Sequence, residues 1–395
     1  MPMLAIDRWA TGPDQLDEHS YRHLKLALQL ATLFLTEDST LGWFCHYTFG
    51  HRKKDASGPY ISPTKYSTSE EALRKVKRNI KELGKVITFM FNPNFSKRDN
   101  SYGVTYNNKR HLPFFHHFRK SEWPDTSKEH SRRHPVVVMH NEFSKYFSQE
   151  GLLDTSRDVW LRTQFLFAIT LVHEIAHAYS MWLEKDYDEP RWSKDDRKAE
   201  LGFSWEKETI GYLCNPLFHE IKGCEMLLSM KAVSYKHGCE QPEIVEELIG
   251  QHPLHFNAMN PAHFQDLFQL EDYRGGRFYA EQQPDSCRNW VIAIYALSLD
   301  WIAAWFDERH WEARHRTWRQ THEHIPPPLG MTFVLVYQKQ SGGTIWVHYP
   351  LDPRIEEDMQ HIPSAAEQER LRGGAKLPNF PASETVYWMP VYYIY

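Results

Sequence analysis

Apolar side chains recur at helical spacing in two segments near the N-terminus. In residues 14–36 they form a stripe that includes Leu24 and Leu28, which predicts an amphipathic helix. A second amphipathic segment opens at Thr68 and closes at Gly84, a residue type that commonly follows the last turn of a helix. The first quarter of the chain is therefore predicted to be largely helical.

Continuous apolar runs replace the helical spacing in the next part of the chain. Residues 86–91 (VITFMF) form one run, which Asn92 and Pro93 end, and residues 136–140 (VVVMH) form another. Such runs predict buried strands. Residues 102–107 predict a short strand between them, so the expected order is helix, strand, short strand, strand.

The longest predicted helix covers residues 156–185. Neither glycine nor proline interrupts it, and Thr155 with Asp158 suits a capping box at its start. Apolar residues lie on most of its faces, which predicts a buried helix of roughly seven to eight turns.

An HExxH motif lies inside this helix, at His173, Glu174 and His177. A spacing of four places both imidazoles on one face, one turn apart, so that they can reach the same tetrahedral Zn²⁺. Glu174 lies about 100° further around the helix, where it can act on a water molecule instead of the metal. Burying these three polar side chains without partners would be costly, and a metal removes that cost. We expect one Zn²⁺ per chain.

The pattern changes again after residue 185. Residues 290–297 and the tryptophans that follow them suggest helices, and two runs joined across a Ser-Gly-Gly turn predict a β-hairpin near residues 332–349. The chain is therefore predicted to have two lobes. Residues 1–185 form an N-terminal α/β lobe with the HExxH helix, and residues 186–395 form a mainly helical C-terminal lobe.

Composition limits the classes of binding partner and the cellular compartment that we expect. A formal net charge of −5 gives no electrostatic case for nucleic acid or an anionic membrane. Polar residues interrupt the longest apolar run, so no membrane span is expected. Residues 1–8 lack the basic and apolar regions of a signal peptide, and five cysteines without CxxC spacing suggest reduced thiols. We expect a cytoplasmic protein, with its oligomeric state left open.

Two known ways of completing an HExxH site fit the chain poorly. The metzincin pattern HExxHxxGxxH is not met, because Ser180 and Leu183 stand at its glycine and last histidine. Asp186 lies nine residues after His177, at the distance seen in aspzincins, but without their preceding Gly-Thr.

Glu200 is the preferred third ligand. It follows a charged loop and opens a new helical stretch, where the small Gly202 would let that helix pack closely on the metal helix. Glu206, Asp186 and Glu208 remain alternatives.

Over about residues 68–215 the chain resembles the zincin superfamily, and HExxH with the downstream Glu200 resembles the gluzincins in particular. This resemblance implies an α+β, two-lobed zincin-like fold, with a small twisted β-sheet over the HExxH helix and a mainly helical second lobe. It also implies that the strand nearest the metal, expected at residues 136–140, binds substrate by backbone pairing.

The resemblance further implies a zinc-dependent peptidase or amide hydrolase acting on a peptide or small amide. In such an enzyme His173, His177 and Glu200 hold the metal, and Glu174 moves a proton from water to the leaving amine. A tyrosine or histidine usually stabilises the oxyanion, for which Tyr212 and His219 are candidates.

Two other functions fit the same motif. One is a zincin-scaffold enzyme that acts on a non-peptide small molecule, because the HExxH site does not dictate a peptide substrate. The other is a non-catalytic zincin-like binding protein. The intact Glu174 argues against the second, since a structural site has no need of that carboxylate.

Overall fold

The structure is a computed structural model. It describes residues 1–10, 16–92, 102–106, 134–148, 155–184, 189–194, 196, 199–216, 224, 227–235, 254–259, 289–327, 329, 333–338 and 344–350. The chain splits into two compact units. Unit 1 consists of Met1–Tyr212, Phe218–Glu225 and Asp300–Pro327, and unit 2 consists of Leu213–Leu217, Met226–Leu299 and Pro328–Tyr395.

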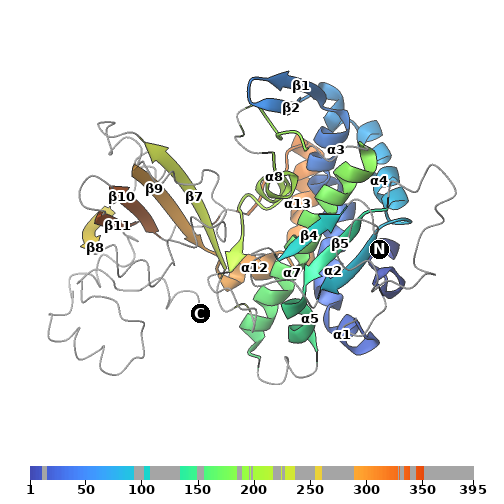
Figure 1. The fold of residues 1–395 in the computed structure, drawn as a ribbon, viewed down its shortest axis with the longest axis horizontal. Helices are drawn as coiled ribbons and strands as arrows, with labels where there is room; N and C mark the ends of the chain where they lie inside the picture. The colour runs from blue at the N-terminus through green and yellow to red at the C-terminus, as the bar shows by residue number, and fades with distance from the viewer. Residues whose placement is uncertain are drawn as a thin grey trace. The chain divides into compact units, whose positions relative to one another are not determined.

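Unit 1 combines helices with a small sheet and a separate hairpin (Figure 1). Its helices are α1 (Glu18–His23), α2 (Lys25–Thr36), α3 (Gly42–Phe49), α4 (Glu70–Leu83), α5 (Asn141–Phe147), α7 (Arg157–Leu183), α8 (Leu201–Thr209), α12 (Leu299–Ala304) and α13 (Glu308–Thr321). Its strands are β1 (His51–Asp55), β2 (Gly58–Ser62), β3 (Thr88–Asn92), β4 (Gly103–Tyr106) and β5 (Val136–His140). Short 3₁₀ turns lie at Pro2–Leu4, Ile6–Arg8, Asp38–Thr40 and Lys65–Thr68. The described elements bear out the predicted mixture of helix and strand.

The single helix predicted for residues 14–36 is two helices, α1 and α2, which meet at Leu24. A buried glutamine on α7 satisfies the backbone at this break. Gln164 Nε2 donates to the carbonyl of His23 at 2.6 Å, and its Oε1 accepts from the N–H of Ala27 at 2.9 Å. Helix ends leave such groups without partners inside their own helix. The break therefore depends on a residue about 140 positions away, which the local pattern does not reveal.

The small sheet has the order β3-β5-β4. β3 and β5 are parallel, with Thr88 opposite Val136, and β4 runs antiparallel to β5, with Gly103 opposite Met139. The prediction that residues 136–140 form the substrate-binding edge is wrong, because β5 is the central strand. Within the described residues β4 has a neighbour on one side only. The fully buried valines of β5 suit a strand that is paired on both sides.

α7 is the central helix of unit 1. Ser156 precedes its first turn, and most of its 27 residues are buried, including Leu171, Val172 and Ile175 on both sides of the first histidine. It packs against α2, α8 and the sheet strands β4 and β5, which lie beside it in Figure 1. The helix thus carries its polar motif into the protein core.

Unit 2 contains a six-stranded antiparallel sheet in its described part, with the order β6-β7-β9-β10-β11-β8. The strands are β6 (Asn215–Pro216), β7 (Leu227–Tyr235), β8 (Leu254–Met259), β9 (Asn289–Ala296), β10 (Phe333–Gln338) and β11 (Thr344–Pro350). The pairing of β10 with β11 confirms the predicted hairpin.

The rest of the C-terminal half differs from the prediction. Residues 290–297, expected to be helical, lie largely in β9, and the described elements of unit 2 are strands. A short apolar run rich in valine, isoleucine and aromatic residues fits a strand as well as a helix, so its period alone does not decide. The boundary between the two units is also not at residue 185, because α8, α12 and α13 belong to unit 1. Leu299, the first residue of α12, is the one exception and falls in unit 2. Among the described residues, no helix is both long and apolar enough to cross a membrane.

Candidate metal centre

His173 and His177 lie one turn apart on α7, with ring centroids 5.1 Å apart. Their Nε2 atoms face the carboxylate of Glu200, whose Oε1 is 2.7 Å from His177 Nε2 and 3.3 Å from His173 Nε2. One ligand atom from each of the three side chains lies within 4.8 Å of the others. Two imidazole nitrogens and one carboxylate oxygen match the donor set found in catalytic zinc sites, in which a fourth position is left for water or substrate.

The start of α8 holds the Glu200 side chain in position. It is the N-cap residue of this helix, and one of its carboxylate oxygens accepts the backbone N–H of Phe203. Capping fixes the side chain and leaves the other oxygen directed at the two histidines. The residue that opens the helix can therefore also serve as the third ligand.

The other nitrogen of each imidazole contacts a second carboxylate. His173 Nδ1 lies 2.7 Å from Glu206 Oε1, and His177 Nδ1 lies 2.5 Å from Glu189 Oε1. Each Nδ1–H donates to its carboxylate, and this leaves Nε2 on the side of Glu200. Metal-binding histidines commonly have such a partner, because it fixes the tautomer and the ring orientation.

Three carboxylates around two imidazoles make the centre strongly attractive to positive charge. Burial alone would lower the pKa of His173, but Glu200 and Glu206 raise it to about 10. Glu200 and Glu189 likewise outweigh burial and hold the pKa of His177 well above its usual value. Burial would raise the pKa of Glu200, but the two histidines hold it far below its usual value. A dication would take the place of the protons that these groups bind.

Glu174 points to a different neighbour, strand β4. Its Oε2 accepts from Thr105 Oγ1 at 2.7 Å, and the side chain is buried beside Gly103. A Cβ at residue 103 would come within 2.6 Å of Glu174 Cγ, so any other residue there would force the Glu174 side chain to shift. Burial raises the pKa of Glu174, while the charges of His173 and His177 oppose the rise. A carboxylate with a raised pKa beside a metal-binding group is suited to accept and return a proton.

The close approach of α8 to α7 depends on Gly202. A Cβ at this position would lie 2.2 Å from His173 Nε2. Phe203 places its ring at the edge of the same imidazole, with centroids 4.9 Å apart. Ser204, on the same helix, accepts from Trp43 Nε1 at 2.9 Å and so joins α8 to α3.

An arginine anchors the loop that carries Glu189. Arg191 is 4% exposed, and its guanidinium donates to Asp55 Oδ1 at 2.5 Å on the β1–β2 hairpin. The backbone of Arg191 also binds strand β2, because Arg191 N donates to Pro59 O and Ile61 N donates to Arg191 O. Glu189 Oε2 also accepts from Leu201 N at 3.2 Å. The loop is thus held at the hairpin and at the start of α8.

The remaining candidates from the sequence have other surroundings. Glu206 lies on the Nδ1 side of His173, and Glu208 accepts from Trp192 Nε1 at 3.2 Å. Tyr212 packs its ring against Trp301 at a centroid distance of 6.0 Å. Two further candidates, Asp186 and His219, lie outside the described residues.

Sequence reasoning missed Glu189, Thr105 and Gly103. Glu189 lies in a charged loop, where nothing distinguishes it from its acidic neighbours. Thr105 and Gly103 lie 68 or more positions before the motif, and only the sheet brings them to Glu174. For Gly103 the sole signal was a glycine within a predicted strand, which often marks a close approach.

Comparison with known protein families, with curated proteins and with solved structures gives no match for this chain.

Proposed function

We propose that the protein is a zinc-dependent hydrolase of peptide or other amide bonds, with a gluzincin-like centre in a zincin-like fold. The observation that carries the proposal is the shared orientation of His173, His177 and Glu200, with a carboxylate behind each imidazole. The donor set fits zinc, and a zinc ion bound there would polarise a carbonyl group and lower the pKa of water.

Glu174 has the surroundings of the general base and acid. Its carboxylate lies beside the centre without belonging to the ligand set, and Thr105 holds it in place. In this role Glu174 accepts a proton from the attacking water and later donates it to the leaving nitrogen. The same proton is returned, so the group is unchanged after each turnover.

Among the described strands, β4 pairs on one side only, and this supports a peptide as the substrate. The N–H of His140 donates to the carbonyl of Tyr102, and antiparallel pairs alternate in their hydrogen bonding. The N–H and C=O groups of Gly103 and Thr105 therefore point away from β5. An extended peptide that pairs with them would lie beside Glu174, since the side chain of Thr105 contacts that residue.

Glu174→Gln tests the proposal. Glutamine keeps the size of the side chain but cannot accept the proton, so the variant should bind zinc as the wild type does and lose more than about 100-fold in hydrolysis. Cleavage of a mixed peptide library, followed by mass spectrometry, measures the activity and also reports which bonds are cut.

Thr105→Val serves as the graded comparison. It removes the hydrogen bond to Glu174 while leaving the ligands intact, so activity should fall less than in Glu174→Gln. Equal turnover by Glu174→Gln and the wild type would contradict the proposed role.

A further inference from the structure

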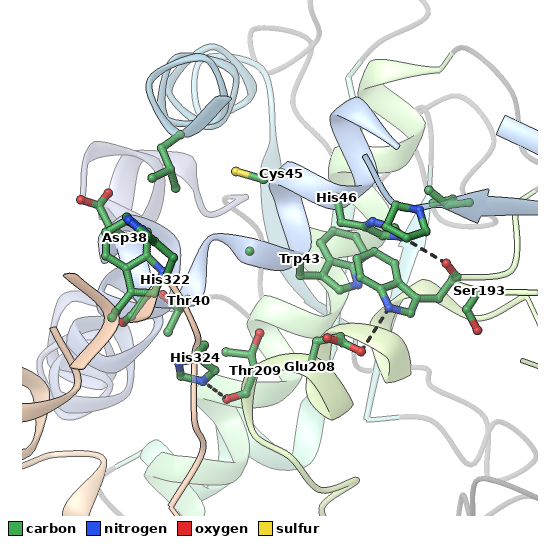
Figure 2. Close-up of a pocket in the computed structure, with 17 residues that line it drawn as sticks. Asp38, Thr40, Trp43, Cys45, His46, Ser193, Glu208, Thr209, His322 and His324 are labelled. Atoms are coloured by element: carbon green, nitrogen blue, oxygen red, sulfur yellow. Dashed lines mark hydrogen bonds between the residues drawn. The ribbon is translucent and has the colours of Figure 1, made fainter. Parts of the chain in front are cut away.

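A cavity of about 430 Å³ lies in unit 1, and none of the three candidate metal ligands lines it. Figure 2 shows its side chains in two groups across an open space, with Asp38, Thr40 and His322 on one side and Trp43, His46 and Glu208 on the other. Its walls come from the start of α3, the loop that carries Trp192, the end of α8 and the segment after α13. Volumes of this size suit a small organic ligand.

The aromatic side of the cavity is a fixed stack of rings. Trp43 is 2% exposed and lies between Tyr47, at a centroid distance of 5.4 Å, and Trp192, at 5.3 Å with the rings nearly parallel. His46 meets the edge of Trp192 at 4.2 Å. Trp318 adds a third indole from α13. Because these rings hold one another in place, the wall exists before any ligand arrives.

Two polar atoms of the lining residues have no hydrogen-bond partner among the described residues. One is the hydroxyl of Ser39, a residue that is 2% exposed, and the other is Nδ1 of His324. His324 Nε2 donates to the carbonyl of Thr209 at 2.7 Å, so its Nδ1 is a hydrogen-bond acceptor. Buried polar groups without partners are rare and costly, and a bound molecule is one way of satisfying them.

The charges of the lining are negative. No lysine or arginine among the described residues lines the cavity, whereas Asp38 and Glu208 do. Asp38 is neutralised by Lys77 at 2.5 Å, but Glu208 makes no ion pair with a described residue. Burial lowers the pKa of His46 and of His324, which keeps both imidazoles uncharged near neutral pH.

We propose that this cavity binds a small organic cation, an ammonium or guanidinium group carried on an apolar body. The carboxylate of Glu208 stabilises the positive charge, and the indoles of Trp192 and Trp318 line the apolar body. The acceptors on Ser39 and His324 receive the N–H groups. An anion would meet Glu208 with no cation to compensate. This inference does not depend on the proposed hydrolase activity.

Three phenylalkyl probes of similar size and different charge test the proposal on the full-length protein by calorimetry. They are phenethylamine (cationic), phenethyl alcohol (neutral) and 3-phenylpropionate (anionic). We expect saturable binding of the amine, at least about tenfold tighter than that of the alcohol, and no binding of the carboxylate. Absence of amine binding, or equal affinity for the carboxylate, would overturn the proposal.

Gly42→Leu locates the binding site. Gly42 lines the cavity and a Cβ at this position meets nothing within 4 Å, so a leucine there should reduce the open volume. The variant should fold, as circular dichroism will show, and should lose amine binding by at least about tenfold. Unchanged binding would place the amine elsewhere and refute the assignment.

Glu208→Gln isolates the charge. The variant keeps an acceptor for Trp192 Nε1. It should lower the affinity for the amine several-fold and leave the affinity for the alcohol unchanged. Glu312→Gln removes an exposed negative charge on α13 outside the cavity and is the matched control. An equal loss in both variants would mean that the net charge of the protein, and not this wall, attracts the cation.

Discussion

The two carboxylate oxygens of Glu200 have different partners, and both are needed to define the centre. One caps α8 through the N–H of Phe203, and the other faces His173 and His177. The first role agrees with the helical stretch predicted to open at Glu200. The second role follows from the close packing of two helices, which a local pattern does not encode, so the sequence left Glu206, Asp186 and Glu208 as alternatives.

Replacing Glu200 should weaken zinc binding without unfolding the protein. In Glu200→Ala the two histidines keep their Nδ1 partners but lose the third ligand, so we expect the zinc dissociation constant to rise by more than about 100-fold. Titration with a competing chelator measures it. Glu82→Gln, an exposed change on α4, is the control and should bind as the wild type does. Unchanged affinity in Glu200→Ala would assign the third ligand to another residue.

The raised pKa of His173 predicts how stability depends on pH in the metal-free protein. A group whose pKa is higher when folded stabilises the fold fully below its unfolded pKa, and this contribution is lost as the pH rises through the folded value. For His173 the window runs from about 6.5 to about 10. The melting temperature should therefore fall across this window when a chelator is present.

Glu206→Gln separates this effect from other titrations. It removes one of the charges that raise the pKa of His173, so the variant should lose less stability than the wild type between these two pH values. Differences in melting temperature between the two proteins at each pH provide the measurement. Parallel curves would show that His173 does not couple to Glu206.

At the scale of elements, the sequence predicted α4, α7 and the strands of the small sheet because each carries its own period or apolar run. It did not predict the break between α1 and α2, which Gln164 of α7 stabilises from a distance. It also placed β5 at the edge, since pairing order is a tertiary property that a five-residue run does not encode. Among the described strands, β4 is instead at the end of the order β3-β5-β4, beside Glu174.

The contact between α7 and α8 should be sensitive to a single methyl group. Gly202→Ala would place a Cβ against the imidazole of His173, so α8 or the imidazole must shift. We expect a destabilisation of about 1–3 kcal/mol and weaker zinc binding, measured by chemical denaturation and chelator competition. Gly42→Ala, at a helical glycine with open space around it, should not lower stability. Equal stabilities for the two variants would contradict the close packing.

For the molecule as a whole, the groups that would hold a metal and those that would perform the chemistry come from different parts of the chain. Both histidines, Glu200 and the two supporting carboxylates lie within residues 173–206. Thr105 and Gly103 reach Glu174 only through the folded sheet of unit 1. The sequence could therefore point to the candidate ligands, but not to the surroundings of Glu174 or to the order of the strands in the small sheet.

The zinc content of the purified, full-length protein tests the central claim most directly. We predict about one zinc per chain by elemental mass spectrometry. A strong chelator should remove this zinc, and added zinc should restore it. His173→Ala should bind less than a tenth of that amount, with a circular dichroism spectrum that shows a folded chain. A folded wild-type protein that takes up no zinc, or equal zinc in His173→Ala, would contradict the account.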